Sequence, residues 1–157
     1  MRESRLTGSV GRALVAVFGV ALLSAGVARA DGPVQLKSRL GDFCLDAPSG
    51  NYLTPALINP CNGSDFQRWN LTPVGQFESV AFPGQCLATP GESWAAHMQP
   101  CLDWFTQKWI VQPDGLVTAP GTLGACLTVL GGPVPGTMVS TRFCNAAAPE
   151  QQWDSVG

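Results

Sequence analysis

Cysteine is the residue type whose spacing most clearly predicts chemistry in this chain of 157 residues. Its six copies form three successive pairs, whose members lie 17, 15 and 18 positions apart. Cysteines could bind zinc or form disulfides, but zinc sites usually contain two cysteines separated by two to four residues. No such pair exists here, and His97 is the only histidine. An even number of cysteines favours disulfides if the chain is exported, as its first thirty residues, described below, predict.

The cysteines belong to a unit that occurs three times. Each copy contains Cys-Leu, a second cysteine and a Gln-x-Trp triplet, and successive Cys-Leu starts lie 42 and 40 residues apart. Equivalent copies should close in equivalent ways. The repeat therefore predicts three disulfides, which are Cys44–Cys61, Cys86–Cys101 and Cys126–Cys144.

Residues with catalytic potential show no pattern typical of an enzyme. His97 has no free thiol as a partner once all cysteines are paired, and no Ser-His-Asp motif is present. The acidic residues are scattered, and no two of them are selected as a pair for glycoside hydrolysis. We therefore expect a protein that is not an enzyme and that needs no metal or other cofactor.

The repeats read as short β-strands. Val34-Gln35-Leu36-Lys37 alternates apolar and polar residues, and similar runs recur between turns rich in Gly, Pro, Asn and Asp. Helical periodicity is absent after Asp31, apart from one turn predicted near Ser64–Gln67. The predicted strands extend over 34–37, 43–45, 56–58 and 69–71 in the first repeat; 77–82, 85–88, 96–101 and 108–112 in the second; and 116–118, 125–130, 137–143 and 152–155 in the third.

Three units of four strands are too few for a propeller, so we expect them to close around a pseudo-threefold axis. The large apolar residues recur at equivalent places and at the spacing that directs them to one face of each strand. This indicates that they form a common core. The predicted core residues are Leu45, Leu87, Leu127, Ile58, Met98, Trp69, Trp109 and Trp153.

The first thirty residues have the features of a secretory signal peptide. A basic start containing Arg2, Arg5 and Arg12 precedes an uncharged stretch over 13–28, and Ala28-Arg29-Ala30 suits cleavage after Ala30. The uncharged stretch is shorter than the roughly 20 residues of a membrane-spanning helix. We therefore expect a secreted mature protein of residues 31–157, without a membrane span.

The charge of the mature segment excludes one class of partner. Five basic and ten acidic residues remain after position 30, and the basic ones do not cluster. Nucleic-acid binding requires a concentrated basic patch. No nucleic-acid partner is therefore expected.

The repeated Cys-Leu, paired cysteines and Gln-x-Trp triplets resemble the ricin B-type lectin family. The resemblance covers residues 34–157 and implies an all-β fold, the β-trefoil, in which twelve strands form a six-stranded barrel capped by three hairpins. The repeats would extend approximately over 34–75, 76–114 and 115–157. The stretch 31–41, the segment 59–62 and the last residues look especially like a small secreted mycobacterial member of this family.

The resemblance also implies a carbohydrate site in the first repeat. Members of the family carry an aspartate two residues after the first cysteine, and Asp46 is the only match in this chain. Asn59 occupies the usual aromatic position, and Phe66 the usual asparagine position next to Gln67. The candidate sugar-binding residues are Asp46, Asn59, Gln67, Tyr52 as the missing ring, and Asn62 and Asp65 as polar substitutes.

The other two repeats depart further from the family pattern. Ala88 and Thr128 stand where the aspartate belongs, so we expect no standard sugar site in either repeat. Trp94, Trp104 and His97 fall outside the core pattern or at its rim. The two tryptophans could form a contact surface or pack under a neighbouring loop, and the sequence leaves both possibilities open.

These observations predict a secreted carbohydrate-binding protein that recognises galactose-type or related glycans through one pocket. Its partners would be glycans or glycoconjugates, and self-association would increase avidity. The alternative is a β-trefoil without sugar binding that acts on a protein partner, as an inhibitor or an adhesion factor.

Overall fold

The computed structural model describes residues 32–91 and 94–157, so the predicted signal peptide lies outside the described residues. The first repeat contains β1 (Gln35–Ser38), β2 (Phe43–Asp46), β3 (Leu57–Pro60), a 3-10 turn η1 (Asp65–Gln67) and β4 (Trp69–Leu71). The second contains β5 (Phe77–Ser79), β6 (Gln85–Ala88), β7 (His97–Pro100), η2 (Phe105–Gln107) and β8 (Ile110–Val111). The third contains β9 (Val117–Ala119), β10 (Ala125–Val129), β11 (Thr137–Phe143), η3 (Pro149–Gln151) and β12 (Trp153–Val156).

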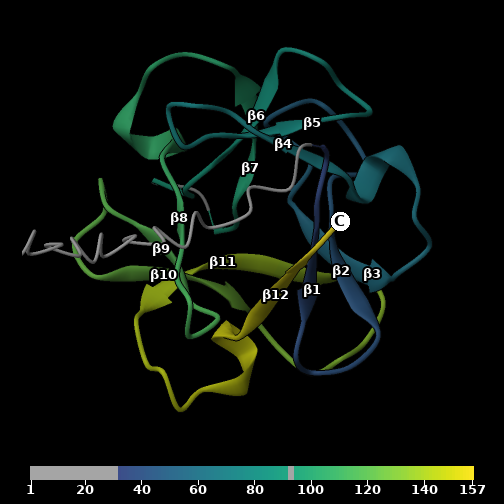
Figure 1. Cartoon of the computed structure of the whole chain (residues 1–157), viewed down its shortest axis with the longest axis vertical. Coiled ribbons are helices and arrows are strands. Elements are labelled where there is room, and N and C mark those ends of the chain that lie inside the picture. Colours follow the sequence, from purple (N-terminus) through teal and green to yellow (C-terminus); the bar gives the residue numbers. More distant parts are fainter. Residues whose placement is uncertain (1–31, 92–93) are drawn as a thin grey trace, which may run out of the picture.

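The strands are arranged as three lobes around a common centre (Figure 1). One antiparallel sheet has the order β12-β1-β2-β3-β11-β10-β9-β8, and the other has the order β4-β5-β6-β7. The bridge between Val34 and Trp69 joins the two sheets. This all-β arrangement of three four-stranded units is the predicted β-trefoil.

Equivalent backbone hydrogen bonds repeat the threefold pattern at both ends of the molecule. At the barrel, the backbone N–H of each core tryptophan donates at 2.8 Å to a carbonyl that precedes β1, β5 or β9. The pairs are Trp69 to Val34, Trp109 to Gly75 and Trp153 to Gly115. At the hairpin end, three residues bond in a cycle. The bonds are Ala56 N–H to Ala96 O (2.8 Å), Ala96 N–H to Val139 O (2.8 Å) and Val139 N–H to Ala56 O (3.0 Å).

The core is the one expected from the repeats. All eight predicted core residues are buried, as the burial of large apolar side chains requires. Each core tryptophan also donates its indole N–H to the carbonyl of the leucine in the same Cys-Leu unit, which satisfies its only polar group. These bonds are Trp69 to Leu45 (3.2 Å), Trp109 to Leu87 (2.9 Å) and Trp153 to Leu127 (3.0 Å).

The three predicted disulfides are confirmed. Cys44–Cys61, Cys86–Cys101 and Cys126–Cys144 are bonded, and each pair has Cα atoms 5.0 Å apart. Each bond joins the strand that carries Cys-Leu to the end of its hairpin partner. The disulfide of the first repeat therefore anchors both strands from which Asp46 and Asn59 project.

Two details of the predicted secondary structure are wrong. The predicted strand over 108–112 is reduced to Ile110–Val111, and the strand over 77–82 ends at Ser79. The turn predicted near Ser64–Gln67 is present as η1, but equivalent 3-10 turns, η2 and η3, were not expected. A three-residue turn is too short to produce a hydrophobic period, so composition does not reveal it.

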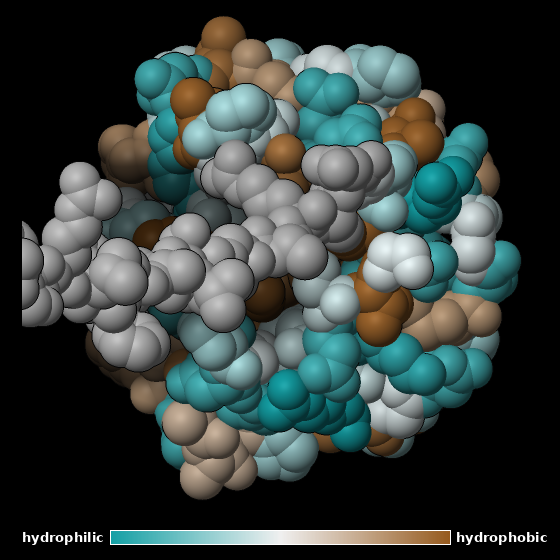
Figure 2. Space-filling model, in the orientation of Figure 1, coloured by the Kyte–Doolittle hydropathy of each residue, from teal (hydrophilic) through white to brown (hydrophobic). Residues whose placement is uncertain are grey.

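The face of the molecule that is turned toward the viewer in Figure 1 has few continuous apolar areas. Hydrophobic residues form small separate patches among hydrophilic ones on the face shown in Figure 2. Within residues 32–91 and 94–157, no helix has the length and apolar composition needed to cross a membrane.

One ion pair makes the stability of the barrel closure depend on pH. Arg39 donates from Nε (3.0 Å) and Nη2 (2.8 Å) to Asp154 on β12, and this hydrogen bonding lowers the pKa of Asp154. A carboxyl group with a lowered pKa stabilises the folded protein above the ordinary pKa of 3.8. This stabilisation is lost as the pH falls through the folded-state pKa.

Asp154→Asn should therefore lower the free energy of unfolding slightly at pH 7, and the difference from the wild type should shrink below pH 3.8. Urea unfolding at pH 7 and at pH 3 measures this; an equal difference at both pH values would contradict it.

Candidate functional site

Asp46, at the end of β2, has a carboxylate that is fixed by two side-chain amides. Asn59 Nδ2 and Gln67 Nε2 each donate to the same oxygen, Oδ2, at 3.1 Å. Among the described residues nothing donates to the other oxygen, Oδ1. This oxygen does not belong to the fully buried polar atoms that lack a partner. Asp46 is 6% exposed. The arrangement leaves one fixed carboxylate oxygen free to accept hydrogen bonds at the surface.

Asn59 holds Asp46 from the neighbouring strand and connects the site to the third repeat. Because Cys44 pairs with Asn59, and Asp46 with Leu57, the amide approaches the carboxylate from the end of β3. Asn59 Oδ1 also accepts a 3.0 Å hydrogen bond from the backbone N–H of Gly136. Gly136 has a φ of 84°, in the left-handed region that favours glycine. The loop before β11 therefore supports the amide that orients Asp46.

Gln67 also supports Asp46 and is fully buried. Its Nε2 donates to Pro60 O (3.0 Å), and its Oε1 accepts from Asn62 N–H (3.0 Å). The glutamine thereby closes the loop around Cys61 by bonding to the residues on either side of it. A side chain with these bonds orients Asp46 rather than standing open to solvent.

The glutamines of the other Gln-x-Trp triplets make the same pair of bonds. Gln107 bonds to Pro100 O (2.8 Å) and Leu102 N–H (2.9 Å), and Gln151 bonds to Phe143 O (2.9 Å) and Asn145 N–H (2.7 Å). The Gln of the triplet is thus a structural element of every repeat. What differs among the repeats is the third partner of each glutamine.

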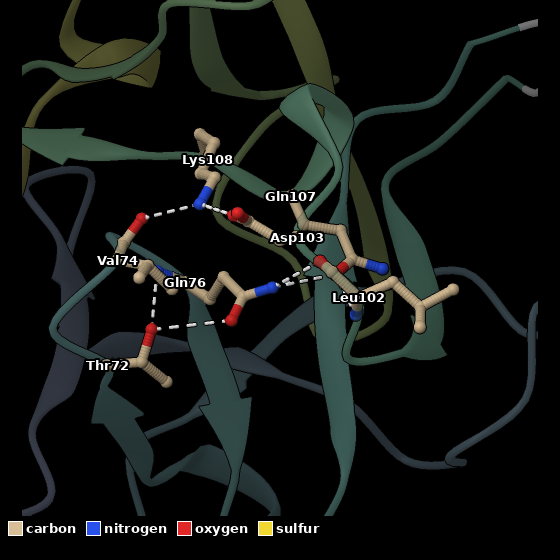
Figure 3. Close-up of polar contacts among 7 residues, drawn as sticks. All are labelled: Thr72, Val74, Gln76, Leu102, Asp103, Gln107 and Lys108. Atoms are coloured by element: carbon tan, nitrogen blue, oxygen red, sulfur yellow. Dashed lines mark hydrogen bonds and ion pairs between the residues drawn. The ribbon is translucent and has the colours of Figure 1, made fainter.

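In the second repeat the third partner is another glutamine, as Figure 3 shows. Gln76 Nε2 donates to Gln107 Oε1 (2.9 Å) and to Leu102 O (2.6 Å), which joins the residue before β5 to the loop after Cys101. The same view shows Lys108 bonded to Val74 O (3.0 Å) and paired with Asp103. Ala88 offers no polar group here, so this repeat lacks the carboxylate of the first.

In the third repeat Gln151 Nε2 donates to Thr128 Oγ1 at 3.1 Å. The same hydroxyl donates to Cys126 O at 2.7 Å. Arg142, at the position of Asn59, is exposed, and its Nη1 donates to the neighbouring carbonyl of Thr141. Asp46 is therefore the only carboxylate at the three equivalent positions.

The two polar substitutes proposed from the sequence have exposed side chains with other bonds. Asn62 Oδ1 accepts from the backbone N–H of Ser64 (2.9 Å), and Asp65 Oδ1 pairs with Arg68 Nη1 (3.4 Å). Neither side chain bonds to Asp46. The structure thus joins Asp46, Asn59 and Gln67 directly, and leaves the side chains of Asn62 and Asp65 bonded elsewhere.

Tyr52 lies with residues of the second and third repeats. Together with Trp94, His97 and Met138 it lines a hollow of about 200 Å³. Tyr52 is 66% exposed and Trp94 is 87% exposed, whereas His97 is buried. His97 is absent from the hydrophobic core cluster, as the sequence suggested, although its side chain is buried. Its ring pairs with Ala95 O and Gln99 Nε2 beneath the surface.

A larger hollow of about 770 Å³ lies at the barrel end, away from these residues. It is lined mainly by the segments that follow the core tryptophans, including Leu71, Pro73 and Ile110. No charged side chain of the described residues lines it, and Asp46 lies in neither hollow. The chemistry of Asp46, rather than the size of a cavity, identifies the candidate site.

The described residues contain no cluster of three or more His, Cys, Asp or Glu side chains arranged for a metal ion. The acceptor groups at Asp46 instead suit hydroxyl donors, because a carboxylate accepts charge-assisted hydrogen bonds.

Comparison with known protein families agrees with this fold and with this repeat pattern. The family model for the ricin-type beta-trefoil lectin domain matches residues 32–153. The chain belongs to this family. Uncharacterized proteins of Mycobacterium bovis and Mycobacterium tuberculosis are each 65% identical to it over 159 residues, covering 99% of both chains.

Solved structures of β-trefoils share the fold at low sequence identity. A non-toxic homologue of type II RIPs from Momordica charantia, in complex with alpha-methyl-D-galactoside, superposes with a TM-score of 0.70 at 18% identity. The match covers 80% of this chain and 49% of the Momordica chain, so this ricin-type chain spans about half of that length. The Vibrio vulnificus hemolysin/cytolysin β-trefoil lectin with N-acetyl-D-lactosamine bound gives 0.66 at 22% identity, covering 82% and 96%.

Phe66, which stands at the usual asparagine position, lies beside the candidate site. Its carbonyl accepts from the N–H of Ala47, next to Asp46, at 3.0 Å. Its ring is 44% exposed and packs against Phe82 with centroids 5.8 Å apart. An exposed aromatic ring thus lies in a segment bonded directly beside the candidate site.

Proposed function

We propose that this ricin-type protein is a secreted lectin that binds a galactose-type sugar at a shallow site around Asp46. The observation that carries the proposal is the carboxylate of Asp46, fixed through Oδ2 by Asn59 and Gln67 while Oδ1 accepts no bond from the described residues. A hexose presents neighbouring hydroxyl groups, and a fixed carboxylate can accept hydrogen bonds from them. Asp46 is therefore the proposed direct ligand.

The supporting residues have different proposed roles. Gln67 positions the carboxylate, because both its amide nitrogen and its oxygen already bond within the protein. Asn59 also positions it and connects it to the third repeat. Asn62 and Asp65 are proposed as rim contacts, since both have exposed side chains.

The choice of sugar rests on relatives of the fold. The Momordica structure contains a methyl galactoside, and the Vibrio structure contains N-acetyl-D-lactosamine, a disaccharide that includes galactose. Both ligands are facts about those proteins. For this chain a galactose-type sugar is the proposal, with binding and no catalysis as its activity.

Secretion completes the proposal. Residues 1–30 have the pattern of a signal peptide, whose removal would leave the β-trefoil in the exported part of the chain. Three disulfides suit an oxidising extracellular compartment. One shallow site per chain binds weakly by itself, so we propose that self-association or a dense glycan surface provides avidity.

The test is isothermal titration of residues 31–157 with methyl β-D-galactoside. Asp46→Asn keeps the size of the side chain but removes its charge, and each lost charge-assisted hydrogen bond costs about 1.5–3 kcal/mol. We expect affinity to fall about tenfold to a hundredfold. Asp103→Asn is the matched control, because Asp103 is exposed in the second repeat. Equal affinity of the wild type and Asp46→Asn would contradict the site.

A further inference from the structure

The hollow lined by Tyr52, Leu53, Pro55, Trp94, His97 and Met138, here called the axial hollow, lies at the hairpin end of the molecule. The bridge between Pro55 and His97 stands directly beside the cycle of hydrogen bonds that joins Ala56 and Ala96 to Val139. All three repeats meet at this cycle. The axial hollow is therefore built by two hairpins and β11 together, and not by one repeat.

The walls of the axial hollow are aromatic and uncharged. Tyr52 and Trp94 are largely exposed, and no charged side chain of the residues described here lines the hollow. The ring nitrogens of His97 are engaged, because Nδ1 lies 3.2 Å from Ala95 O and Nε2 lies 2.8 Å from Gln99 Nε2. Such walls favour a flat apolar group over a charged one.

Strand register connects the axial hollow to Asp46. Asp46 on β2 is paired with Leu57 on β3, and Leu57 is paired with Met138 on β11. Directly paired residues of neighbouring strands lie on the same face of a sheet. With strands about 4.8 Å apart, Met138 lies about 10 Å from Asp46 across the sheet. One row of residues on this face thus runs from Asp46 through Leu57 to Met138, which lines the hollow.

We propose that the axial hollow is a second subsite of the Asp46 site and binds a flat apolar face attached to the anomeric carbon of the sugar. This inference rests on the proposed sugar site. The attached face could belong to an aryl group or to the C–H side of a second pyranose, since both offer the same chemistry. A volume of about 200 Å³ suits one ring and is smaller than a typical pocket for a drug-sized ligand.

The test compares three probes by isothermal titration, namely methyl β-D-galactoside, phenyl β-D-galactoside and N-acetyllactosamine. Aromatic stacking is worth about 0.5–1.5 kcal/mol, so the phenyl glycoside should bind the wild type about threefold to tenfold tighter than the methyl glycoside. This advantage should disappear in Trp94→Ala and in Tyr52→Ala. It should persist in Trp104→Ala, the matched control, because Trp104 is also exposed but does not line the hollow.

The outcomes separate the two proposals. Equal affinities for the methyl and both larger probes in the wild type would overturn the second subsite while leaving the Asp46 site intact. An advantage that survives in Trp94→Ala and Tyr52→Ala would overturn it as well. An advantage confined to the phenyl probe assigns the subsite to aryl groups, and one shared with N-acetyllactosamine assigns it to a pyranose face. Absence of binding to all three probes would contradict the proposed function and this inference together.

Discussion

Trp69→Ala is expected to lower the free energy of unfolding by about 3–5 kcal/mol, as replacement of a buried aromatic side chain by alanine does. Trp69 is fully buried in the core, and its indole N–H donates to Leu45 O. The substitution therefore leaves both a cavity and an unpaired carbonyl in the strand that carries Asp46. Urea unfolding of oxidised protein measures the loss.

Trp104→Ala is the control for this prediction. Its side chain is 53% exposed and is absent from the core cluster, so the same chemical change should alter stability by less than about 0.5 kcal/mol. A similar loss in both variants would show that the threefold tryptophan core does not carry the stability assigned to it.

Gln67→Ala and Gln107→Ala are expected to destabilise the protein by similar amounts, about 2–3 kcal/mol each. Both glutamines are fully buried, and both bond to the residues on either side of the second cysteine of their repeat. Their removal leaves a carbonyl and an N–H without their partners. Urea unfolding should give nearly equal losses.

Sugar binding should separate the two variants. Gln67 Nε2 donates to Asp46, whereas the second repeat has Ala88 at that position, and Gln107 instead accepts a bond from Gln76 through Oε1. At a temperature where both variants are folded, Gln67→Ala should weaken binding of methyl β-D-galactoside, and Gln107→Ala should leave it near that of the wild type. Equal weakening would contradict the positioning role of Gln67.

The repeated motif made most of the fold predictable. Three copies of Cys-Leu and Gln-x-Trp determine the disulfides, the core tryptophans and the strands that carry them, because each copy must bury equivalent groups. The turns η2 and η3 were missed, since three residues give no period. The burial of His97 was also missed, because it depends on pairing with Ala88 and Pro55 from other strands.

The sequence indicated which residues to examine as a candidate site. Asp46 stands out by its place after Cys44, and Asn59 by its place before Cys61. The path from Asp46 through Leu57 to Met138 could not be predicted, because β3 and β11 belong to different repeats and no local pattern specifies their register. Nor could sequence separate the structural bonds of Gln67, shared with Gln107 and Gln151, from its contact with Asp46.

The most direct test of the proposed site is an NMR titration of ¹⁵N-labelled residues 31–157 with methyl β-D-galactoside, following side-chain amide signals. Asn59 and Gln67 both donate to Asp46, so their amide signals should shift together and saturate as the sugar binds. Gln107 and Gln151, which make the equivalent bonds in the other repeats, should stay unchanged. Shifts at Gln107 or Gln151 without shifts at Asn59 and Gln67, or no shift at any of them, would contradict a sugar site at Asp46.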